Sequence, residues 1–270
     1  MRSVLITGAN KGIGLATSLL LARSGYIVHA TMRDLSRSCE LTDTAEKEGL
    51  TIRNSALDVN SDASVSEAVG AIQGEHGPID ILINNAGIAR RGSIEELPIS
   101  EFRALIETNY FGAVRCIQAV MPEMRRRKSG CIINVSSVGG RIASPPLTAY
   151  AASKWALEAM SEGLAQEAKV FNIRVAVVEP GIIDTGMSRE IASEPDASAY
   201  PQGRRMAGLF SAALAEQPTP TSVVAEKILE IIESGSWKFR HTAGPDAEAY
   251  IQRRFAMSDE EWIARGAATN

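Results

Sequence analysis

Short apolar runs alternate with longer stretches of helical periodicity along most of the chain. The apolar runs have the length of short buried strands and fall at Val4–Ile6, Ile27–Met32, Leu50–Ala56, Ile79–Asn84, Cys131–Val135, Ile173–Val178 and Trp237–His241. Helical periodicity covers Ile13 to about Gly25, Asp62–Gln73, about Glu101–Arg127, Ala149–Val170 and Thr219–Glu233. Strands that are separated by helices predict a parallel sheet with helices on both faces.

No linker or shift in composition interrupts this alternation, so we expect a single α/β domain over residues 1–270. Its fold class would be a doubly wound parallel sheet of about seven strands. In such sheets a ligand sits beyond the carboxyl ends of the strands. The residues that follow the predicted strands at that end are Gly8, Arg33, Asp58, Asn85, Ser137 and Pro180.

The composition predicts a large hydrophobic core and argues against nucleic acid and anionic membranes as partners. Hydrophobic residues make up 45% of the chain, and the net charge is -4, which favours neither nucleic acid nor an anionic membrane. Three scattered cysteines lack the spacing of a disulfide framework or a metal site. We find no signal peptide and no run long enough to span a membrane. The expectation is a cytoplasmic protein that binds no metal.

A glycine-rich turn, Thr7 to Gly14, joins the first predicted strand to the first helix. Such a turn offers unpaired backbone N–H groups and the positive end of a helix dipole to an anion, and a pyrophosphate suits it. Gly8 allows the tight turn, Gly12 lets the backbone approach the phosphates, and Gly14 permits close packing of helix on strand. The spacing G-x-x-x-G-x-G departs from the usual G-x-G-x-x-G.

Tyr150 and Lys154 lie four residues apart in a helical pattern and therefore share one face. A free tyrosine has a pKa of about 10 and is a poor base at neutral pH. A neighbouring ammonium favours the phenolate, as does the positive ring of an oxidised nicotinamide. Ser137, at the end of a predicted strand, can offer its hydroxyl to the same substrate oxygen.

The ordered set of motifs resembles the short-chain dehydrogenase/reductase family, from about residue 2 to 185. It comprises Thr7–Gly14, Asn84-Asn85-Ala86-Gly87, Asn109, Ser137, Tyr150-x-x-x-Lys154 and Pro180-Gly181. The resemblance implies a Rossmann-type fold and an oxidoreductase. It is similar in particular to the branch of steroid and retinoid dehydrogenases, through Ala30–Leu35 and Ala243–Ala247.

The resemblance also implies catalytic roles. Tyr150 would be the general acid/base, and Lys154 would bind the nicotinamide ribose and lower the pKa of the tyrosine. Ser137, rather than Ser136, would polarise the substrate carbonyl. Asn109 would hold a water in the proton relay behind Lys154.

The cofactor-binding residues implied by the resemblance surround the predicted strand ends. Asp58 and Val59 would touch the adenine, and Asn85, Ala86 and Gly87 would line the adenosine ribose. Ile183 and Thr185 would hold the carboxamide and the pyrophosphate. The full set is Gly8, Asn10, Lys11, Gly12, Ile13, Gly14, Arg33, Asp58, Val59, Asn85, Ala86, Gly87, Tyr150, Lys154, Pro180, Gly181, Ile183 and Thr185. Glu179 and Asp184 are interpreted as solvated or structural.

Cofactor choice depends on the end of the second predicted strand. NAD-specific sheets usually have Asp or Glu there, where it binds the ribose 2′-hydroxyl. Here Arg33 follows the strand, and Lys11 lies in the glycine-rich turn; both can bind a 2′-phosphate, which predicts NADP(H). Asp34 counts against this, unless it points away from Arg33 or pairs with a helix start. NAD(H), with Arg33 and Lys11 merely solvated, is the alternative.

The activity expected is hydride transfer between nicotinamide and a carbonyl or secondary alcohol of a small, apolar substrate. The alternatives are an NAD-dependent alcohol dehydrogenase of the same fold and a non-catalytic NADP(H)-binding sensor or scaffold. Residues of about 186–217 would form a helical flap over the substrate, and about 247–270 a C-terminal tail. Apolar residues of the flap either line a pocket or pack on the core; they are Met187, Ile191, Met206, Leu209 and Phe210.

Apolar stripes run along the predicted helices that contain Leu105–Met121 and Tyr150–Val170. Core packing accounts for most of them. The family resemblance implies that part of these stripes forms a face between subunits. We therefore expect a homodimer or a homotetramer.

Overall fold

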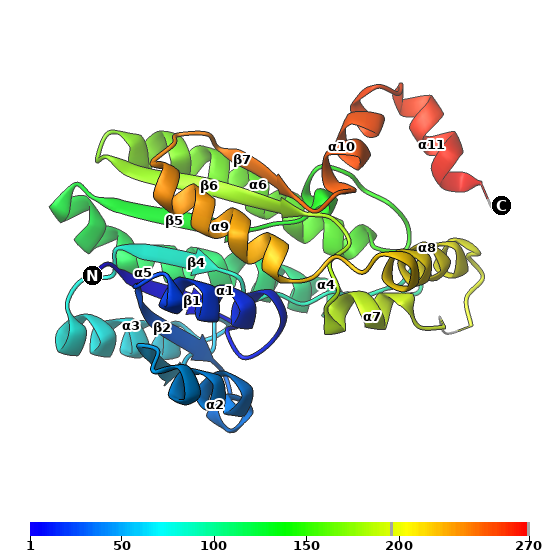
Figure 1. Cartoon of the computed structure of the whole chain (residues 1–270). Helices are drawn as coiled ribbons and strands as arrows, with labels where there is room; N and C mark the ends of the chain where they lie inside the picture. The colour runs from blue at the N-terminus through cyan, green and yellow to red at the C-terminus, as the bar shows by residue number, and fades with distance from the viewer. Residues whose placement is uncertain (195–196, 269–270) are drawn as a thin grey trace.

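A single parallel sheet of seven strands organises the computed structural model, which describes residues 1–194 and 197–268. The strands lie in the order β3-β2-β1-β4-β5-β6-β7 (Figure 1). Their bounds are β1 Ser3–Thr7, β2 Ile27–Met32, β3 Ile52–Ala56, β4 Ile81–Asn84, β5 Gly130–Val135, β6 Ile173–Pro180 and β7 Arg240–Ala243. The predicted doubly wound α/β fold in one domain is confirmed.

Helices cover both faces of the sheet. One face packs against α1 (Gly12–Arg23), α2 (Cys39–Glu48) and α9 (Ser222–Ser234). The other packs against α3 (Asp62–His76), α5 (Gly112–Arg127) and α6 (Thr148–Lys169). The remaining segments are η1 Leu35–Arg37, α4 Ile99–Ile106, η2 Glu107–Phe111, η3 Val138–Gly140, α7 Gly186–Ala192, α8 Gln202–Glu216, α10 Ala247–Phe255 and α11 Asp259–Ala267.

The central strands are buried on both faces because helices cover each side. All four residues of β4 and all five of β1 are buried. This explains why the sequence reads there as continuous apolar runs rather than as an alternation of polar and apolar residues. Consecutive residues of one strand point to opposite faces of the sheet and join different cores. Leu5 packs in one core and Ile6 in the other.

The order of strands reverses between β1 and β4, the first and fourth strands of the chain. At such a reversal the loops leave the sheet in opposite directions and open a crevice at its carboxyl end. α7, α8, α10 and α11 gather at one end of the sheet, on the right in Figure 1. They come from the predicted flap and tail, and the tail forms the helices α10 and α11.

Several predicted boundaries need correction. The long helix is continuous with a π-helical segment, η2, in its middle, and this segment carries Asn109. The last strand begins at Arg240, three residues later than predicted, because pairing with β6 starts there and Trp237 instead lies beside Lys169. α2 was not predicted, because Cys39–Glu48 contains few apolar residues.

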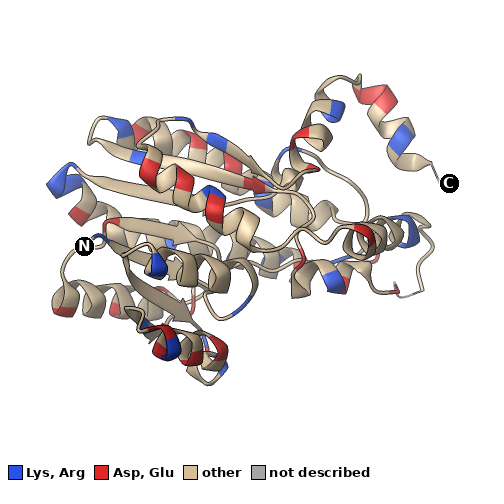
Figure 2. Ribbon diagram, viewed as in Figure 1, with Lys and Arg blue, Asp and Glu red and all other residues tan. Residues whose placement is uncertain are grey.

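Charged residues of both signs are mixed over the outer helices, as Figure 2 shows along α2 and α9. Within the ranges 1–194 and 197–268, no helix is both long enough and apolar enough to cross a membrane.

Candidate active site

A cavity of about 1190 Å³ opens beyond the carboxyl ends of the strands. Of the residues predicted from the sequence to bind a cofactor or to act in catalysis, all but two line it. The exceptions are Gly14 and Asn109, which lie directly behind the wall. The crevice between β1 and β4 forms one end of the cavity, and α7, α8 and α11 surround the other.

The glycine-rich turn has the geometry that an anion site needs. Gly8 and Gly12 adopt positive φ angles of 66° and 57°, which side chains rarely allow. Gly14 packs so tightly that a Cβ would lie 2.3 Å from the carbonyl oxygen of Gly8. No side chain caps the N-terminus of α1, and its first turn carries no acidic residue. The turn therefore fits a dinucleotide pyrophosphate.

Asn85 ties the end of β4 to the glycine-rich turn. Its side-chain amide donates to the carbonyl oxygens of Thr7 and Gly8 over 2.9 and 3.0 Å. Its backbone N–H donates to the hydroxyl of Thr7. These bonds cross the point where the strand order reverses, so they hold the two sides of the crevice at a fixed separation.

Arg33 and Lys11 both line the cavity, whereas Asp34 does not. The carboxylate of Asp34 accepts from the backbone N–H and the hydroxyl of Ser36, over 3.0 and 2.6 Å. It thus caps η1, the helix start that the sequence left as one possibility. Among the described residues, neither Arg33 nor Lys11 forms an ion pair with a carboxylate. Both cations are available to a ligand at this end.

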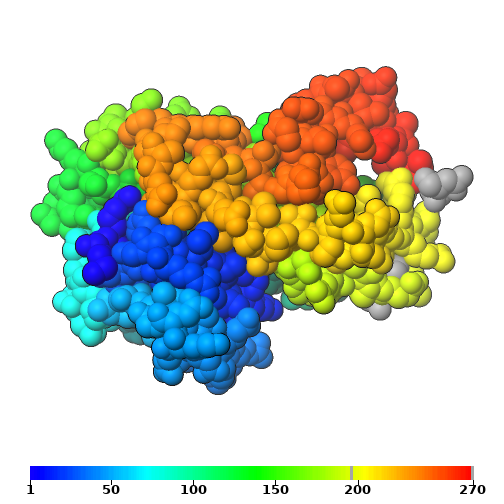
Figure 3. All heavy atoms as spheres, in the orientation of Figure 1, coloured from blue at the N-terminus to red at the C-terminus, as the bar shows by residue number. Residues whose placement is uncertain are grey.

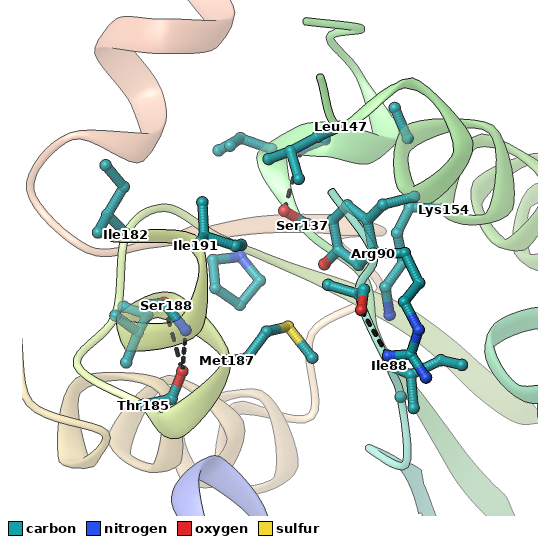
Figure 4. Close-up of a pocket in the computed structure, with 18 of the residues that line it drawn as sticks. Ile88, Arg90, Ser137, Leu147, Lys154, Ile182, Thr185, Met187, Ser188 and Ile191 are labelled. Atoms are coloured by element: carbon teal, nitrogen blue, oxygen red, sulfur yellow. Dashed lines mark hydrogen bonds between the residues drawn. The ribbon is translucent and has the colours of Figure 1, made fainter. Parts of the chain in front are cut away.

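Tyr150, Ser137 and Lys154 meet at the middle of the cavity. Gly139 packs close to both the tyrosine ring and the serine: a Cβ on Gly139 would lie 3.3 Å from Cε1 of Tyr150 and 3.4 Å from Oγ of Ser137. The Lys154 Nζ atom lies 5.9 Å from the centre of the Tyr150 ring. In Figure 4, Ser137 and Lys154 flank one side of the pocket, opposite Met187 and Ile191 of α7.

Ser137 and Lys154 both keep hydrogen-bond donors that a ligand can use. The Ser137 hydroxyl oxygen accepts from the backbone N–H of Gly139 over 3.0 Å, so its own O–H remains to donate. The Lys154 ammonium uses one donor on the carbonyl of Val135, at 2.8 Å. It lies near Gly87, whose added Cβ would be 3.7 Å from Nζ. Two of its N–H donors remain.

Burial governs the titration of this pair. Desolvation raises the pKa of the Tyr150 phenol, and its interaction with the Ser137 hydroxyl lowers that pKa. Desolvation lowers the pKa of the Lys154 ammonium to about 8, and the charge of Glu158 acts in the opposite direction. The lowering of the Tyr150 pKa by Lys154 and by the positive ring of an oxidised nicotinamide remains a prediction.

Asn109 lies buried behind the cavity and holds the segment after β4. Its amide oxygen accepts from the backbone N–H of Ile88 over 2.8 Å, and its amide nitrogen donates to the carbonyl of Ile88 and to the hydroxyl of Ser153. It therefore joins Ile88, which lines the cavity, to α6. The water-holding role remains a prediction.

Apolar side chains of the flap line the far end of the cavity. The five apolar flap residues named from the sequence all line it, and none belongs to the two core clusters. Sequence reasoning missed further lining residues, which include Arg90, Ile142, Leu147, Ile182, Tyr250 and Trp262. One signal was readable: Ser258 and Glu261 form a capping box that begins α11, the helix that carries Trp262.

Two contacts place α11 over this end of the cavity. The indole N–H of Trp262 donates to the carbonyl of Ala143 over 3.3 Å. The guanidinium of Arg205, on α8, donates to the carbonyls of Arg265, Gly266 and Ala268 at the end of α11. Figure 3 shows α11, in red, reaching beside α8, in yellow, with a notch between them.

Comparison with known proteins is consistent with this geometry. The family model for short chain dehydrogenase matches residues 2–196. The oxidoreductase BOA17 of Botryotinia fuckeliana is 35% identical over 263 residues, which cover 95% of each chain. Retinol dehydrogenase 8 of Bos taurus is 41% identical over 204 residues, covering 74% of this chain but only 65% of the relative.

Solved structures give the same result. A short-chain dehydrogenase from Streptomyces avermitilis superposes with a TM-score of 0.82 at 29% identity, covering 99% of both chains. A gluconate 5-dehydrogenase from Burkholderia cenocepacia, solved with NADP and tartrate, has a TM-score of 0.76 at 25% identity. It covers 92% of this chain and 95% of its own.

Proposed function

This chain belongs to the short-chain dehydrogenase family, and we propose that it is an NADP(H)-dependent enzyme that interconverts a carbonyl group and a secondary alcohol on an apolar small molecule. The observation that carries this proposal is the single cavity that joins the uncapped N-terminus of α1 to Tyr150 and Ser137. A dinucleotide needs the first feature, and proton transfer to an oxygen needs the other two.

Each group then has one task. When bound, the nicotinamide supplies or accepts the hydride. Tyr150 gives its phenolic proton to the substrate oxygen in reduction and takes it back in oxidation. Ser137 donates a hydrogen bond to that oxygen, since its hydroxyl oxygen accepts from Gly139 and its O–H remains free to donate. Lys154 binds the ribose hydroxyls with its remaining N–H donors, and its charge stabilises the phenolate.

Several contacts support NADP(H) over NAD(H). Arg33 and Lys11 line the adenosine end, whereas Asp34, the acid next to Arg33, is occupied by Ser36. A guanidinium and an ammonium can both bind a 2′-phosphate by charge-assisted hydrogen bonds. The gluconate 5-dehydrogenase of similar fold was solved with NADP.

We propose that residues 186–217, the flap, enclose the substrate together with α11. The flap contributes apolar side chains such as Met187 and Phe210, and the polar residues Gln202 and Arg205 of α8 also line the cavity. The apolar side chains of the flap favour a substrate whose carbonyl or hydroxyl lies on a hydrocarbon body.

A further proposal concerns assembly. Phe111 and Trp155 are 44% and 51% exposed and lie on η2 and α6, which pack against each other. Exposed aromatic side chains on neighbouring elements are typical of subunit interfaces. We propose that this surface joins two copies of the chain in a homodimer or a homotetramer.

Turnover by the purified protein tests the activity. NADPH with a series of apolar ketones, and NADP⁺ with the matching alcohols, would be monitored through the absorbance of the reduced nicotinamide. We expect turnover of at least one ketone and its alcohol. Tight NADPH binding without turnover across the series would contradict the proposal and favour the non-catalytic sensor. Faster turnover with NADH would favour the NAD-dependent alternative.

A further inference from the structure

A network of acidic and basic side chains lies behind the Tyr150 wall of the cavity. The Glu158 carboxylate, on α6, accepts from Arg240 of β7 over 3.0 Å. The Glu179 carboxylate, on β6, accepts from Arg141, just after η3, over 3.1 Å and lies 3.6 Å from Arg240. Arg240 also pairs with Glu162, on α6, at 2.7 Å. None of these five side chains lines the cavity.

Glu158 lies one helical turn beyond Lys154, so both side chains share a face of α6. Lys154 is 5% exposed and Glu158 is 4% exposed. The ammonium has a neutral carbonyl, that of Val135, as its hydrogen-bond acceptor. A buried cation is costly unless a negative charge lies nearby. Glu158 is the acidic residue closest to Lys154 along the helix, and it provides that charge.

Glu158 also approaches the turn that carries Ser137. A Cβ added to Gly140 would lie 2.9 Å from Cγ of Glu158, 3.3 Å from its Oε1, and 2.6 Å from Oγ of Ser136. Only glycine leaves this room. Among the described residues, the buried Oε1 of Glu158 has no hydrogen-bond partner, because Arg240 binds the other oxygen. Arg240 therefore compensates only part of this carboxylate.

We propose that Glu158 is a positioning residue that keeps Lys154 in its charged form, acting through Lys154 without touching the substrate. This inference rests on the proposed role of Lys154 beside Tyr150. The charged groups around Glu158 are Lys154 and Glu162 on its own helix, Arg240 on β7, Glu179 on β6 and Arg141 after η3. Two arginines face three carboxylates in this network, so the positive charge of Lys154 makes the number of basic groups equal to the number of acidic ones.

The titration of these groups agrees in direction. The charge of Glu158 raises the pKa of Lys154 against the effect of burial. Burial and the charge of Glu158 raise the pKa of Glu179, which Arg141 and Arg240 lower. Loss of the Glu158 charge leaves Lys154 neutral over more of the pH range. A neutral amine stabilises the Tyr150 phenolate less, so the phenol then ionises at higher pH.

The first experiment measures the titration of Lys154 by NMR in the full chain without added dinucleotide. Lysine is labelled at Cε, and the signal is assigned by its absence in Lys154→Arg. We expect Glu158→Gln to lower the pKa of Lys154 by about one unit or more. The matched control is Glu162→Gln, which also removes a carboxylate from Arg240 but at a site 57% exposed; there we expect a shift below about 0.3 unit.

The second experiment measures the pH dependence of kcat for alcohol oxidation. Glu158→Gln should move the half-maximal pH upward by about 0.5 unit or more, and Glu158→Asp, which retains the charge, should restore it. An unchanged titration of Lys154 in Glu158→Gln would overturn the proposal. So would a uniform loss of kcat with an unshifted pH profile, which a purely structural role would produce.

The NMR titration uses no substrate, so it distinguishes failure of this inference from failure of the proposed function. Suppose that Glu158→Gln lowers the pKa of Lys154 as expected but the unmodified protein turns over no ketone. The proposal for Glu158 would then hold, and the proposed enzymatic activity would be wrong. If Glu158→Gln does not fold, the pKa of Lys154 in the unmodified protein tests the proposal instead. The proposal requires Lys154 to remain charged at neutral pH, so a pKa below about 7 would overturn it.

Discussion

The ammonium of Lys154 donates a hydrogen bond to the carbonyl oxygen of Val135 over 2.8 Å. Val135 ends β5, two residues before Ser137, and Lys154 lies one turn beyond Tyr150 on α6. This bond therefore joins the end of β5, which precedes the serine, to α6, which carries the tyrosine. Its acceptor is a backbone atom, so changes to neighbouring side chains leave it in place.

Tyr150→Phe should abolish turnover but leave NADPH binding almost unchanged. The phenol alone handles the proton, whereas the glycine-rich turn and Lys154 hold the dinucleotide. A positioned acid/base group typically contributes 10²–10⁴-fold. Steady-state rates and fluorescence titration with NADPH measure the two effects. Tyr26→Phe, which is outside the cavity, serves as the control. Activity above about a tenth of the original would exclude Tyr150 as the acid/base.

Lys11→Ala combined with Arg33→Asp should abolish the preference for NADPH over NADH. Removal of charge-assisted bonds to the 2′-phosphate is expected to lower kcat/KM for NADPH by roughly 10- to 100-fold. Arg37→Ala is the matched control, because Arg37 pairs with Asp34 and does not line the cavity. A kcat/KM for NADH equal to or above that for NADPH in the unmodified protein would refute the cofactor assignment.

Trp262→Ala and Arg205→Ala should each raise KM for the substrate without changing the affinity for NADPH. Both residues hold α11 over the apolar end of the cavity. Loss of one apolar contact in a binding pocket is expected to raise KM for the substrate by about 10-fold or more. Glu260→Ala, exposed on the same helix, should leave KM unchanged. Equal losses of NADPH and substrate affinity would show that α11 serves overall stability rather than the substrate.

Trp155→Glu should dissociate the assembly, because it places a charge in the proposed apolar interface. Light scattering at micromolar concentration should give a multiple of 28.9 kDa for the unmodified chain and a smaller mass for the variant. Trp237→Glu is the matched control: this tryptophan is 47% exposed but lies near β7. A mass of 28.9 kDa for the unmodified protein would rule out the proposed oligomer.

His29→Phe should make the protein less sensitive to acid. His29 is fully buried, stacks on His76 with 5.3 Å between ring centres, and has no hydrogen-bond partner for either ring nitrogen among the described residues. Burial, with the charges of His76 and Arg53, lowers its pKa from 6.5 to about 4.

Because the folded pKa lies below the unfolded one, the stabilisation is complete above pH 6.5 and is lost as pH falls toward 4. The full loss is of the order of 3 kcal/mol. Urea unfolding between pH 7 and 4.5 should show a smaller decline in the free energy of unfolding for His29→Phe than for the unmodified protein. Equal declines in the two proteins would assign acid sensitivity to other groups.

The sequence alone determined the fold and identified part of the lining of the cavity. Continuous apolar runs such as Ile81–Asn84 identify strands buried on both faces, and helices between them require a parallel sheet. Chain connectivity then brings the residues after each strand to one edge, so Gly8, Asn85 and Ser137 could be placed together before any coordinates. This works because the period of a strand and the handedness of a crossover are local properties.

Only the tertiary structure decided how distant segments meet. It showed that Asp34 caps η1, that Asn109 binds the backbone of Ile88, and that Arg205 anchors the end of α11. The sequence carries no signal for the meeting of Glu158 with Arg240, which lies 82 residues away. Ion pairs, caps and lid contacts depend on side-chain distances between elements. Those distances follow from packing of the whole sheet and its helices, not from any local pattern.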